Sequence, residues 1–211
     1  MDIYRTPILT ARDAARHLGM PDRTLDAWLA DQDGVTLVHS VSPEVRGGPR
    51  VPFVGVVEAF VLRGLRELGF TKVRIREAAR MIRAEFDDEY GLASQRIDTD
   101  GVELFVRLAH DSHVAVRDGQ RPIEEVLDGF LKDIHWDDSG RPQFLRLEQY
   151  SAGATVIIDP RFAWGAPVLE GSKIPVQSLT DLWRAGESIT TVAHEFGLSP
   201  DVVEGVCRVA A

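Results

Sequence analysis

Hydrophobic residues in the first 86 positions recur mostly at intervals of three and four, which is the spacing of amphipathic helices. Thr10 followed by Asp13 predicts the start of a short helix, and Gly19 predicts its end near Leu18. Pro21 and Asp22 suit the first turn of a second helix. The buried face of that helix is expected to hold Leu25, Trp28 and Leu29.

The pattern then changes to two β-like runs, residues 35–41 and 51–54, separated by prolines and glycines. They predict a hairpin with a flexible tip. Two longer helices follow, the first ending near Gly69. Its buried stripe is predicted to be Phe53, Val57, Phe60, Val61, Leu65 and Leu68, and that of the second Ile75, Ala78, Ala79, Ile82 and Phe86.

From residue 92 to about residue 158 the period is mostly two, which predicts a small β-rich module interrupted by one helix. Alternation over 102–108 and a short run at 113–117 each predict a strand. The helix is expected to begin near Pro122 and to include Leu127 and Leu131. Residues 131–136 and 143–147 flank the turn sequence 137–140 and predict a hairpin.

The last sixty residues return to helical spacing. One helix is expected from about Val176 to Gly186, and serine caps at Ser188 and Ser199, the latter followed by Pro200, predict two more. The fold class is therefore α+β and mainly helical. Three domains are expected, at residues 1–90, 91–154 and 155–211.

Composition narrows the function classes. The chain has 211 residues, of which 44% are hydrophobic and 27% charged, and no run approaches the roughly 20 apolar residues that span a membrane. A single cysteine, Cys207, excludes an internal disulfide and a cysteine-rich metal framework. No secretory signal precedes the first helix, so a cytoplasmic location is expected.

The net charge of −9 is unevenly distributed. Residues 1–86 contain 13 Lys and Arg against 11 Asp and Glu, whereas residues 87–211 contain 11 against 22. The first half can present a phosphate-binding surface. The second half suits a basic partner, although a solvated acidic surface explains the same excess.

A helix-turn-helix requires a small residue in its first helix, a glycine four positions later, and apolar residues six and nine positions beyond that glycine. The chain meets this template twice, with identical offsets. The two sets are Ala15, Gly19, Leu25 and Trp28, and Ala193, Gly197, Val203 and Val206. Each set is also compatible with a helical hairpin that packs internally.

Residues 8–86 resemble the MerR-type winged helix, through the sequences at 9–11, 24–28 and 67–71. The resemblance implies that Arg23, Thr24 and Ala27 face base edges. It further implies phosphate contacts from Arg12, Arg46 and Arg50, and operator DNA as a partner. The same segment carries four aspartates, which oppose binding to phosphate: Asp22, Asp26, Asp31 and Asp33. A homodimer is expected because helix-turn-helix modules normally bind two half-sites, although residues 87 onward lack the long helix through which MerR regulators usually dimerise.

Residues 155–211 resemble a small prokaryotic domain of unknown function that is associated with VapB-like antitoxins. The sequences that carry the resemblance lie at 159–160, 164–168, 171–176, 182 and 185–189. The resemblance implies the antitoxin of a type II toxin-antitoxin system, which neutralises a PIN-domain ribonuclease toxin and regulates its own operon. No catalytic residue and no cofactor are expected. The resemblance does not indicate which surface binds the toxin.

Two other functions fit the same sequence. A MerR-like regulator without a toxin would sense a small molecule in the middle module, and an interaction scaffold would use both helix-turn-helix units for packing.

Metal binding by His110, Asp111 and His113 is disfavoured, because no further ligands lie nearby in the sequence. The acidic runs at 87–89 and 137–138 are expected to be solvated, and Cys207 to be buried and inert. No phosphate loop or nucleophile motif is present, so catalysis is not expected.

Overall fold

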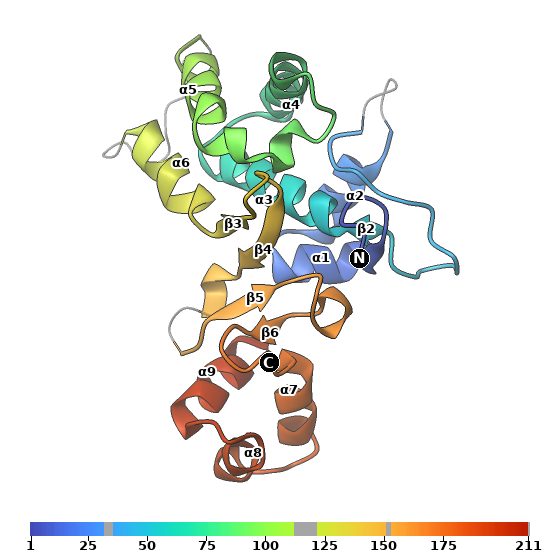
Figure 1. Ribbon diagram of the computed structural model, residues 1–211, viewed down its shortest axis with the longest axis vertical. Coiled ribbons are helices and arrows are strands. Elements are labelled where there is room, and N and C mark those ends of the chain that lie inside the picture. The colour runs from blue at the N-terminus through green and yellow to red at the C-terminus, as the bar shows by residue number, and fades with distance from the viewer. Residues whose placement is uncertain (32–35, 112–121, 151–152, 211) are drawn as a thin grey trace. The chain divides into compact units, whose positions relative to one another are not determined.

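The computed structural model describes residues 1–31, 36–111, 122–150 and 153–210 (Figure 1). Its contacts group the chain into two compact units, residues 2–143 and residues 144–211. The fold is mixed α+β and mainly helical, as the sequence predicts. The finer division into three domains stays a prediction. Among the described residues, no helix is long and apolar enough to cross a membrane.

The first unit begins with the expected helical pair. Strand β1 (Pro7–Leu9) leads into α1 (Ala11–His17) and α2 (Asp22–Leu29). The Thr10 hydroxyl accepts a hydrogen bond from the Asp13 amide at 3.1 Å, which confirms the predicted cap. Strand β2 (Val51–Pro52) pairs antiparallel with β1, and α3 (Phe53–Glu67) and α4 (Lys72–Phe86) follow.

The predicted hairpin between α2 and α3 is wrong, because its two segments do not pair with each other as strands. Residues 36–41 form no regular strand, and β2 pairs with β1 instead. Residues 53 and 54 belong to α3, because Pro52 ends the extended backbone and precedes the helix. A single backbone bond, from Val41 N to Arg50 O at 2.9 Å, joins the two arms of the intervening loop. We refer to residues 41–50 as the wing loop.

The predicted strand at 102–108 is also wrong, since this segment lies within a helix. The chain continues after α4 through η1 (Gly91–Ala93) and η2 (Gln95–Asp98) to α5 (Asp100–Asp111) and α6 (Ile123–Leu131). Phe105, Leu108 and Ala109 are buried at helical spacing, whereas Glu103 and Arg107 are exposed. The apolar residues of this segment fit both the alternation of a strand and one face of a helix. Packing against the neighbouring helices decides in favour of the helix. The strand predicted at 113–117 lies outside the described residues.

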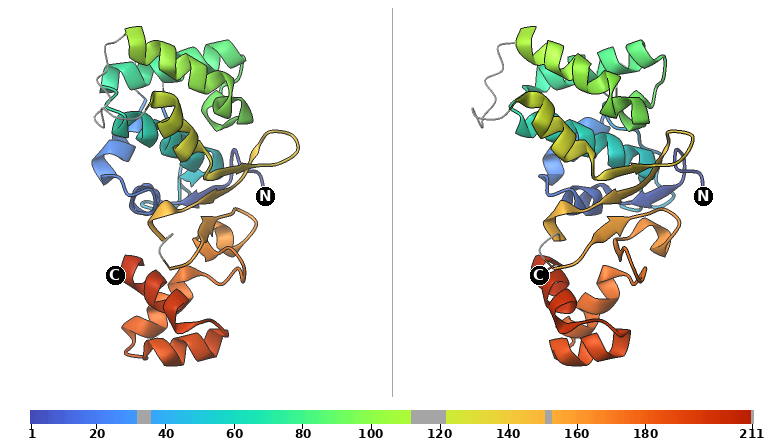
Figure 2. Two further views of the ribbon diagram at one scale, coloured as in Figure 1. Left: turned by 90° about the vertical axis from the view of Figure 1, so that its left-hand side faces the viewer. Right: turned by 60° about the vertical axis from the view of Figure 1, so that its left-hand side comes forward.

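Helix α3 is the centre of the first unit: α4 and α6 pack against it, and α5 packs against α4 and α6 in turn (Figure 2). Nearly all of its residues are buried. The Phe60 ring stacks on Phe130 of α6 with centroids 4.1 Å apart, and the Arg63 guanidinium lies about 5 Å from both rings. Gly64 permits this approach, because a Cβ atom there would lie 2.5 Å from the Phe130 ring.

The hairpin predicted from residues 131–136 and 143–147 is confirmed, but its first strand begins at Ile134, since Leu131 belongs to α6. Strand β3 (Ile134–Trp136) adjoins β4 (Pro142–Arg146), and Asp137 N donates to Arg141 O across the turn at 2.8 Å. The Asp137 carboxylate also accepts hydrogen bonds from Ser139 and Arg141, which hold its pKa below the usual range. This acidic turn is thus a structural feature of the hairpin.

The second unit combines a small antiparallel sheet with a helical trio. Strand β4 pairs with β5 (Val156–Ile158), which pairs with β6 (Val168–Leu169). The turns η3 (Glu148–Tyr150) and η4 (Ala163–Gly165) lie within the connections. Helices α7 (Val176–Arg184), α8 (Ile189–Phe196) and α9 (Pro200–Ala210) begin where the sequence predicts, and the Ser188 hydroxyl caps α8 through the Thr191 amide at 3.0 Å.

Replacement of Gly64 by alanine should destabilise the first unit, because the new methyl group must displace the stacked Phe130 ring. Overpacking of this kind costs about 1–3 kcal/mol, against a helix-propensity gain of about 1 kcal/mol. Gly129→Ala on α6 is the matched control, since a Cβ there meets nothing within 4 Å among the described residues. Thermal unfolding followed by circular dichroism should show a lower Tm for Gly64→Ala alone. Equal Tm values for the two variants would contradict the packing described.

Candidate nucleic-acid interface

The first helix-turn-helix has the geometry that its template requires. Ala15 and Leu25 are fully buried, Trp28 is buried, and Gly19 adopts the left-handed conformation with φ of 62° in the turn. Only glycine adopts this conformation without a steric penalty, which explains the residue at this position. Helix α2 is thereby fixed against α1 with its opposite face in solvent.

The three residues expected to face bases lie together on α2. Arg23 and Ala27 are exposed and Thr24 is half-buried. Their spacing of one and four positions places them on one side of the helix. The structure therefore presents one guanidinium and two small side chains along the solvent face of α2.

The three arginines expected on phosphates flank this helix in different ways. Arg12 on α1 is almost entirely exposed, and Arg46 is exposed in the wing loop beside Gly47. Arg50, at the end of the wing loop, is half-buried. The wing loop therefore exposes Arg46 for a phosphate contact, although it does not form the two-stranded wing that the sequence predicts.

Two of these arginines are close to aspartates of α2. Arg12 Nε lies 3.9 Å from Asp22, and Arg50 Nη2 lies 3.6 Å from Asp26. Arg23 and Arg46 have no ion-pair partner among the described residues. His17 adds no charge at neutral pH, because burial and the neighbouring Arg16 lower its pKa to about 4. The positive potential of this face is therefore partly cancelled by its own aspartates.

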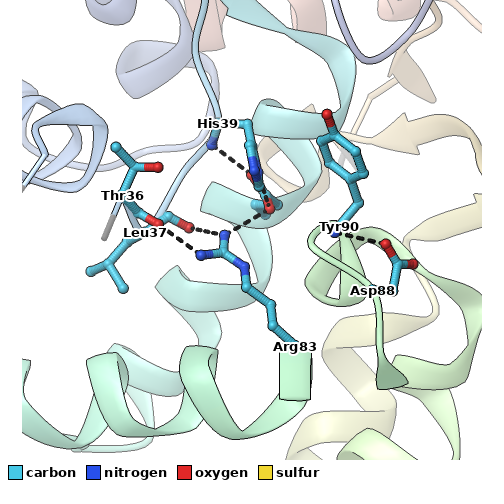
Figure 3. Close-up of polar contacts among 7 residues, drawn as sticks. Thr36, Leu37, His39, Arg83, Asp88 and Tyr90 are labelled. Carbon is cyan, nitrogen blue, oxygen red and sulfur yellow. Dashed lines mark hydrogen bonds and ion pairs between the residues drawn. The ribbon is translucent and has the colours of Figure 1, made fainter. Parts of the chain in front are cut away.

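A buried ionic cluster holds the segment that connects α2 to the wing loop. Glu58 on α3 is fully buried, and its carboxylate accepts a hydrogen bond from the His39 amide at 2.7 Å. His39 Nδ1 lies 2.7 Å from the other carboxylate oxygen. Arg83 of α4 donates to the same carboxylate at 3.0 Å (Figure 3). We refer to Glu58, His39 and Arg83 as the Glu58 cluster.

Arg83 also forms hydrogen bonds with the backbone of the segment that follows α2. It donates to the carbonyl oxygens of Thr36 and Leu37 at 2.7 and 2.9 Å, as the dashed lines in Figure 3 show. The His39 ring packs on Tyr90, with centroids 4.5 Å apart. Segment 36–39 is thereby tied to α3, to α4 and to the turn that follows α4.

The sequence does not reveal that two arginines of the first unit stabilise the fold. Arg63 and Arg83 belong to the basic stretch 63–83, yet Arg63 Nη1 donates to the Leu18 carbonyl at 2.6 Å and Arg83 joins the Glu58 cluster. Neither is available for phosphate. The signal that could have revealed the cluster is Glu58 itself, a lone carboxylate within the apolar stripe of α3.

The second helix-turn-helix also meets its template. Ala193, Val203 and Val206 are buried, and Gly197 has a φ of 63°. Its second helix, α9, exposes Asp201 and Glu204, and the latter pairs with Arg208. Helix α2 also carries two aspartates, but Arg12, Arg46 and Arg50 flank it from α1 and the wing loop, so the face around α2 is the better candidate interface.

The remaining sequence candidates offer little chemistry. No group of three histidines, cysteines or carboxylates placed to hold a metal occurs among the described residues. The run His110–His113 extends into residues that the structure does not describe. Cys207 is buried as predicted, and burial raises the pKa of its thiol.

Comparison with known proteins matches both ends of the chain to described families. Residues 7–79 match a family described as "Putative DNA-binding HTH domain", and residues 156–208 match one described as "Protein of unknown function (DUF433)". The first range contains α1, α2 and the wing loop. The second contains the other helix-turn-helix.

A curated protein and a solved structure, both from Mycobacterium tuberculosis, match nearly the whole chain. "Putative antitoxin VapB45" is 31% identical over 223 residues, covering 94% of this chain and 91% of its own length. The crystal structure of Rv2018 superposes with a TM-score of 0.82 at 31% identity, covering 96% of this chain and 98% of that one. The similarity therefore includes both compact units.

Removal of the Glu58 charge should strongly destabilise the protein. In Glu58→Gln the guanidinium of Arg83, whose side chain is 16% exposed, loses its counter-ion, and breaking a buried pair costs about 3–5 kcal/mol. Glu77→Gln is the control, since its exposed pair with Arg74 contributes less than about 1 kcal/mol. Urea unfolding monitored by fluorescence measures both variants.

The double variant Glu58→Gln, Arg83→Met should lose less stability than the two single variants together, because it leaves no unpaired charge. Strict additivity, or a Glu58→Gln variant as stable as Glu77→Gln, would contradict the role assigned to the Glu58 cluster.

Proposed function

Since this chain belongs to the VapB45 antitoxin family, we propose that it neutralises a PIN-domain ribonuclease toxin by direct binding and represses its own operon by binding operator DNA. The observation that carries the proposal is the extent of the similarity, which covers 94% of this chain and 91% of the antitoxin. A relationship through the helix-turn-helix alone would support only DNA binding.

The first unit supplies the DNA-binding part of this function. Arg23, Thr24 and Ala27 contact base edges in the major groove, and the arginine selects guanine through its two parallel donors. Arg12, Arg46 and Arg50 contact phosphates and set the position of α2. Two copies of the chain bind two half-sites, as helix-turn-helix proteins commonly do.

The acidic residues of the second half of the chain contribute to toxin binding. Residues 87–211 carry twice as many Asp and Glu as Lys and Arg. A ribonuclease has a cationic surface for its RNA, and a surface of opposite charge accelerates association and favours the correct partner. This division of labour assigns operator binding and toxin binding to different parts of one chain.

Co-expression tests the toxin. The small reading frame next to this gene should arrest growth when expressed alone, and growth should recover when this chain is expressed with it. The two proteins should co-purify through an affinity tag on either one and elute together in size-exclusion chromatography. A chain that neither restores growth nor co-purifies with any neighbouring reading frame is a regulator without a toxin, and the proposal is then wrong.

Electrophoretic mobility shifts on the upstream DNA test the second role. Wild type should give a shift that weakens as salt rises, and Arg23→Ala should reduce affinity by about 10-fold or more, as expected for the loss of a bidentate base contact. Asp26→Asn should increase affinity, because it releases Arg50 and removes a charge that repels phosphate. Arg208→Ala, which removes an exposed arginine from α9, should behave as wild type.

The operator hypothesis fails if wild type gives no specific shift, or if Arg208→Ala weakens binding while Arg23→Ala does not. The second result would move the interface to α9. Because the toxin assay uses no DNA, either result leaves the toxin hypothesis to its own test.

A further inference from the structure

We propose that the toxin binds the second unit at a loop centred on Trp164, together with Arg161, Phe162 and Lys173. We refer to these four residues as the Trp164 loop. The inference rests on the proposed function, since it names the surface through which the antitoxin holds its toxin.

Trp164 is exceptionally exposed for its type. Its exposed fraction is 84%, the highest of any large hydrophobic residue that the structure describes, whereas Trp28 is 4% exposed. Tryptophan buries more apolar area than any other side chain and is enriched among the residues that dominate protein interfaces. A single tryptophan in solvent is therefore a strong candidate anchor for a partner.

The backbone beneath this side chain is strained. Ala163, Trp164 and Gly165 have φ values of 45°, 55° and 82°, so two consecutive residues with a Cβ adopt the left-handed conformation. Each non-glycine residue in this region costs free energy, and such conformations cluster at functional sites. The chain accepts this cost in a segment whose central side chain packs on little of the protein itself.

Buried polar contacts fix the loop. Asp159 is fully buried, and its carboxylate accepts hydrogen bonds from the Arg161 amide at 3.0 Å and from the Arg161 guanidinium at 2.6 to 3.2 Å. Backbone bonds from Phe162 to Asp159 and from Gly165 to Phe162 close the turn. Trp164 is consequently presented on a pre-ordered loop, which reduces the entropy lost on binding.

Two cations lie over the ring of Phe162, two residues before Trp164, and indicate the chemistry of the partner. Lys173 Nζ lies 5.0 Å from the centre of the Phe162 ring, and the Arg161 guanidinium carbon lies 5.7 Å from it. Lys173 has no ion-pair partner among the described residues. The complementary surface is therefore an apolar pocket for the indole with one carboxylate that pairs with Lys173, and the remaining cationic surface of the toxin faces the acidic side chains of the same unit.

The charge of the surrounding unit favours a protein over a nucleic acid. Residues 144–211 contain eight Asp and Glu against five Lys and Arg, and Arg161 is neutralised by Asp159. A phosphate backbone would be repelled by most of this unit. A protein pocket that receives one tryptophan and one ammonium group avoids that repulsion.

The experiment measures toxin affinity of the full-length chain by isothermal titration calorimetry, using the toxin obtained by co-expression. Trp164→Ala should raise Kd by about 30-fold or more, as expected for the loss of a hot-spot residue. Trp164→Phe should recover part of that loss, and Lys173→Ala should raise Kd by several fold. Val209→Ala, which truncates another exposed apolar side chain of the same unit, is the matched control and should leave Kd unchanged.

Two further measurements separate binding from folding. The Tm and the operator-binding affinity of Trp164→Ala should equal those of wild type, because the side chain is exposed and lies outside the helix-turn-helix of the first unit. A lower Tm would assign Trp164 to folding. Loss of self-association without loss of toxin affinity would assign the loop to contact with a second copy, and loss of operator binding alone would assign it to DNA. Each of these three results overturns the inference.

The inference and the proposed function can fail separately. A wild-type chain that binds no toxin refutes both. A wild-type chain that binds toxin, with Trp164→Ala binding equally well, refutes only the assignment of the surface.

Discussion

The pairing of one buried carboxylate organises the first unit. Glu58 is located where α3 is otherwise apolar, and an ionised group there is tolerated only if its oxygens are hydrogen-bonded and its charge is balanced. His39 and Arg83 meet both requirements, and Arg83 also binds two carbonyl groups of the chain leaving α2. These ionic contacts, together with hydrogen bonds from the Leu37 and Val38 amides to the Trp28 carbonyl, set the path from the helix-turn-helix to the wing loop.

The features that could be predicted from the sequence depend on neighbours in the chain. Helix starts at Thr10 and Ser188 follow from a hydroxyl and an amide three residues apart, and both turn glycines follow from the left-handed backbone that each turn needs. The predicted strand at 102–108 failed because alternating residues there also fit a helical face, and only packing against α4 and α6 distinguishes the two. The Glu58 cluster joins residues 19 and 25 positions apart, so the apolar stripe around Glu58 indicates that this carboxylate needs partners but does not identify them.

The sequence predicts which residues share the exposed side of α2, but it does not predict which arginines of the candidate interface lie next to aspartates. Arg23, Thr24 and Ala27 occupy one side of α2 because helical spacing requires it. The proximity of Arg12 and Arg50 to two aspartates depends on how α1 and the wing loop fold onto α2, which composition alone does not specify. The Trp164 loop is similar in this respect, since a tryptophan in a glycine- and proline-rich segment gives no indication of whether it faces the core or the solvent.

The two arginine–aspartate pairs also affect how the ionic-strength dependence of operator binding should be interpreted. The slope of affinity against salt counts the small ions released when cationic side chains replace those condensed on DNA. Arg12 and Arg50 are already near internal anions, and Asp22 and Asp26 must acquire other counter-ions once phosphates take their partners. In the proposed operator complex, uptake by the aspartates would offset release from the DNA, so a slope measured for it would underestimate the number of arginine–phosphate contacts. In this protein a shallow salt dependence is compatible with an extensive interface.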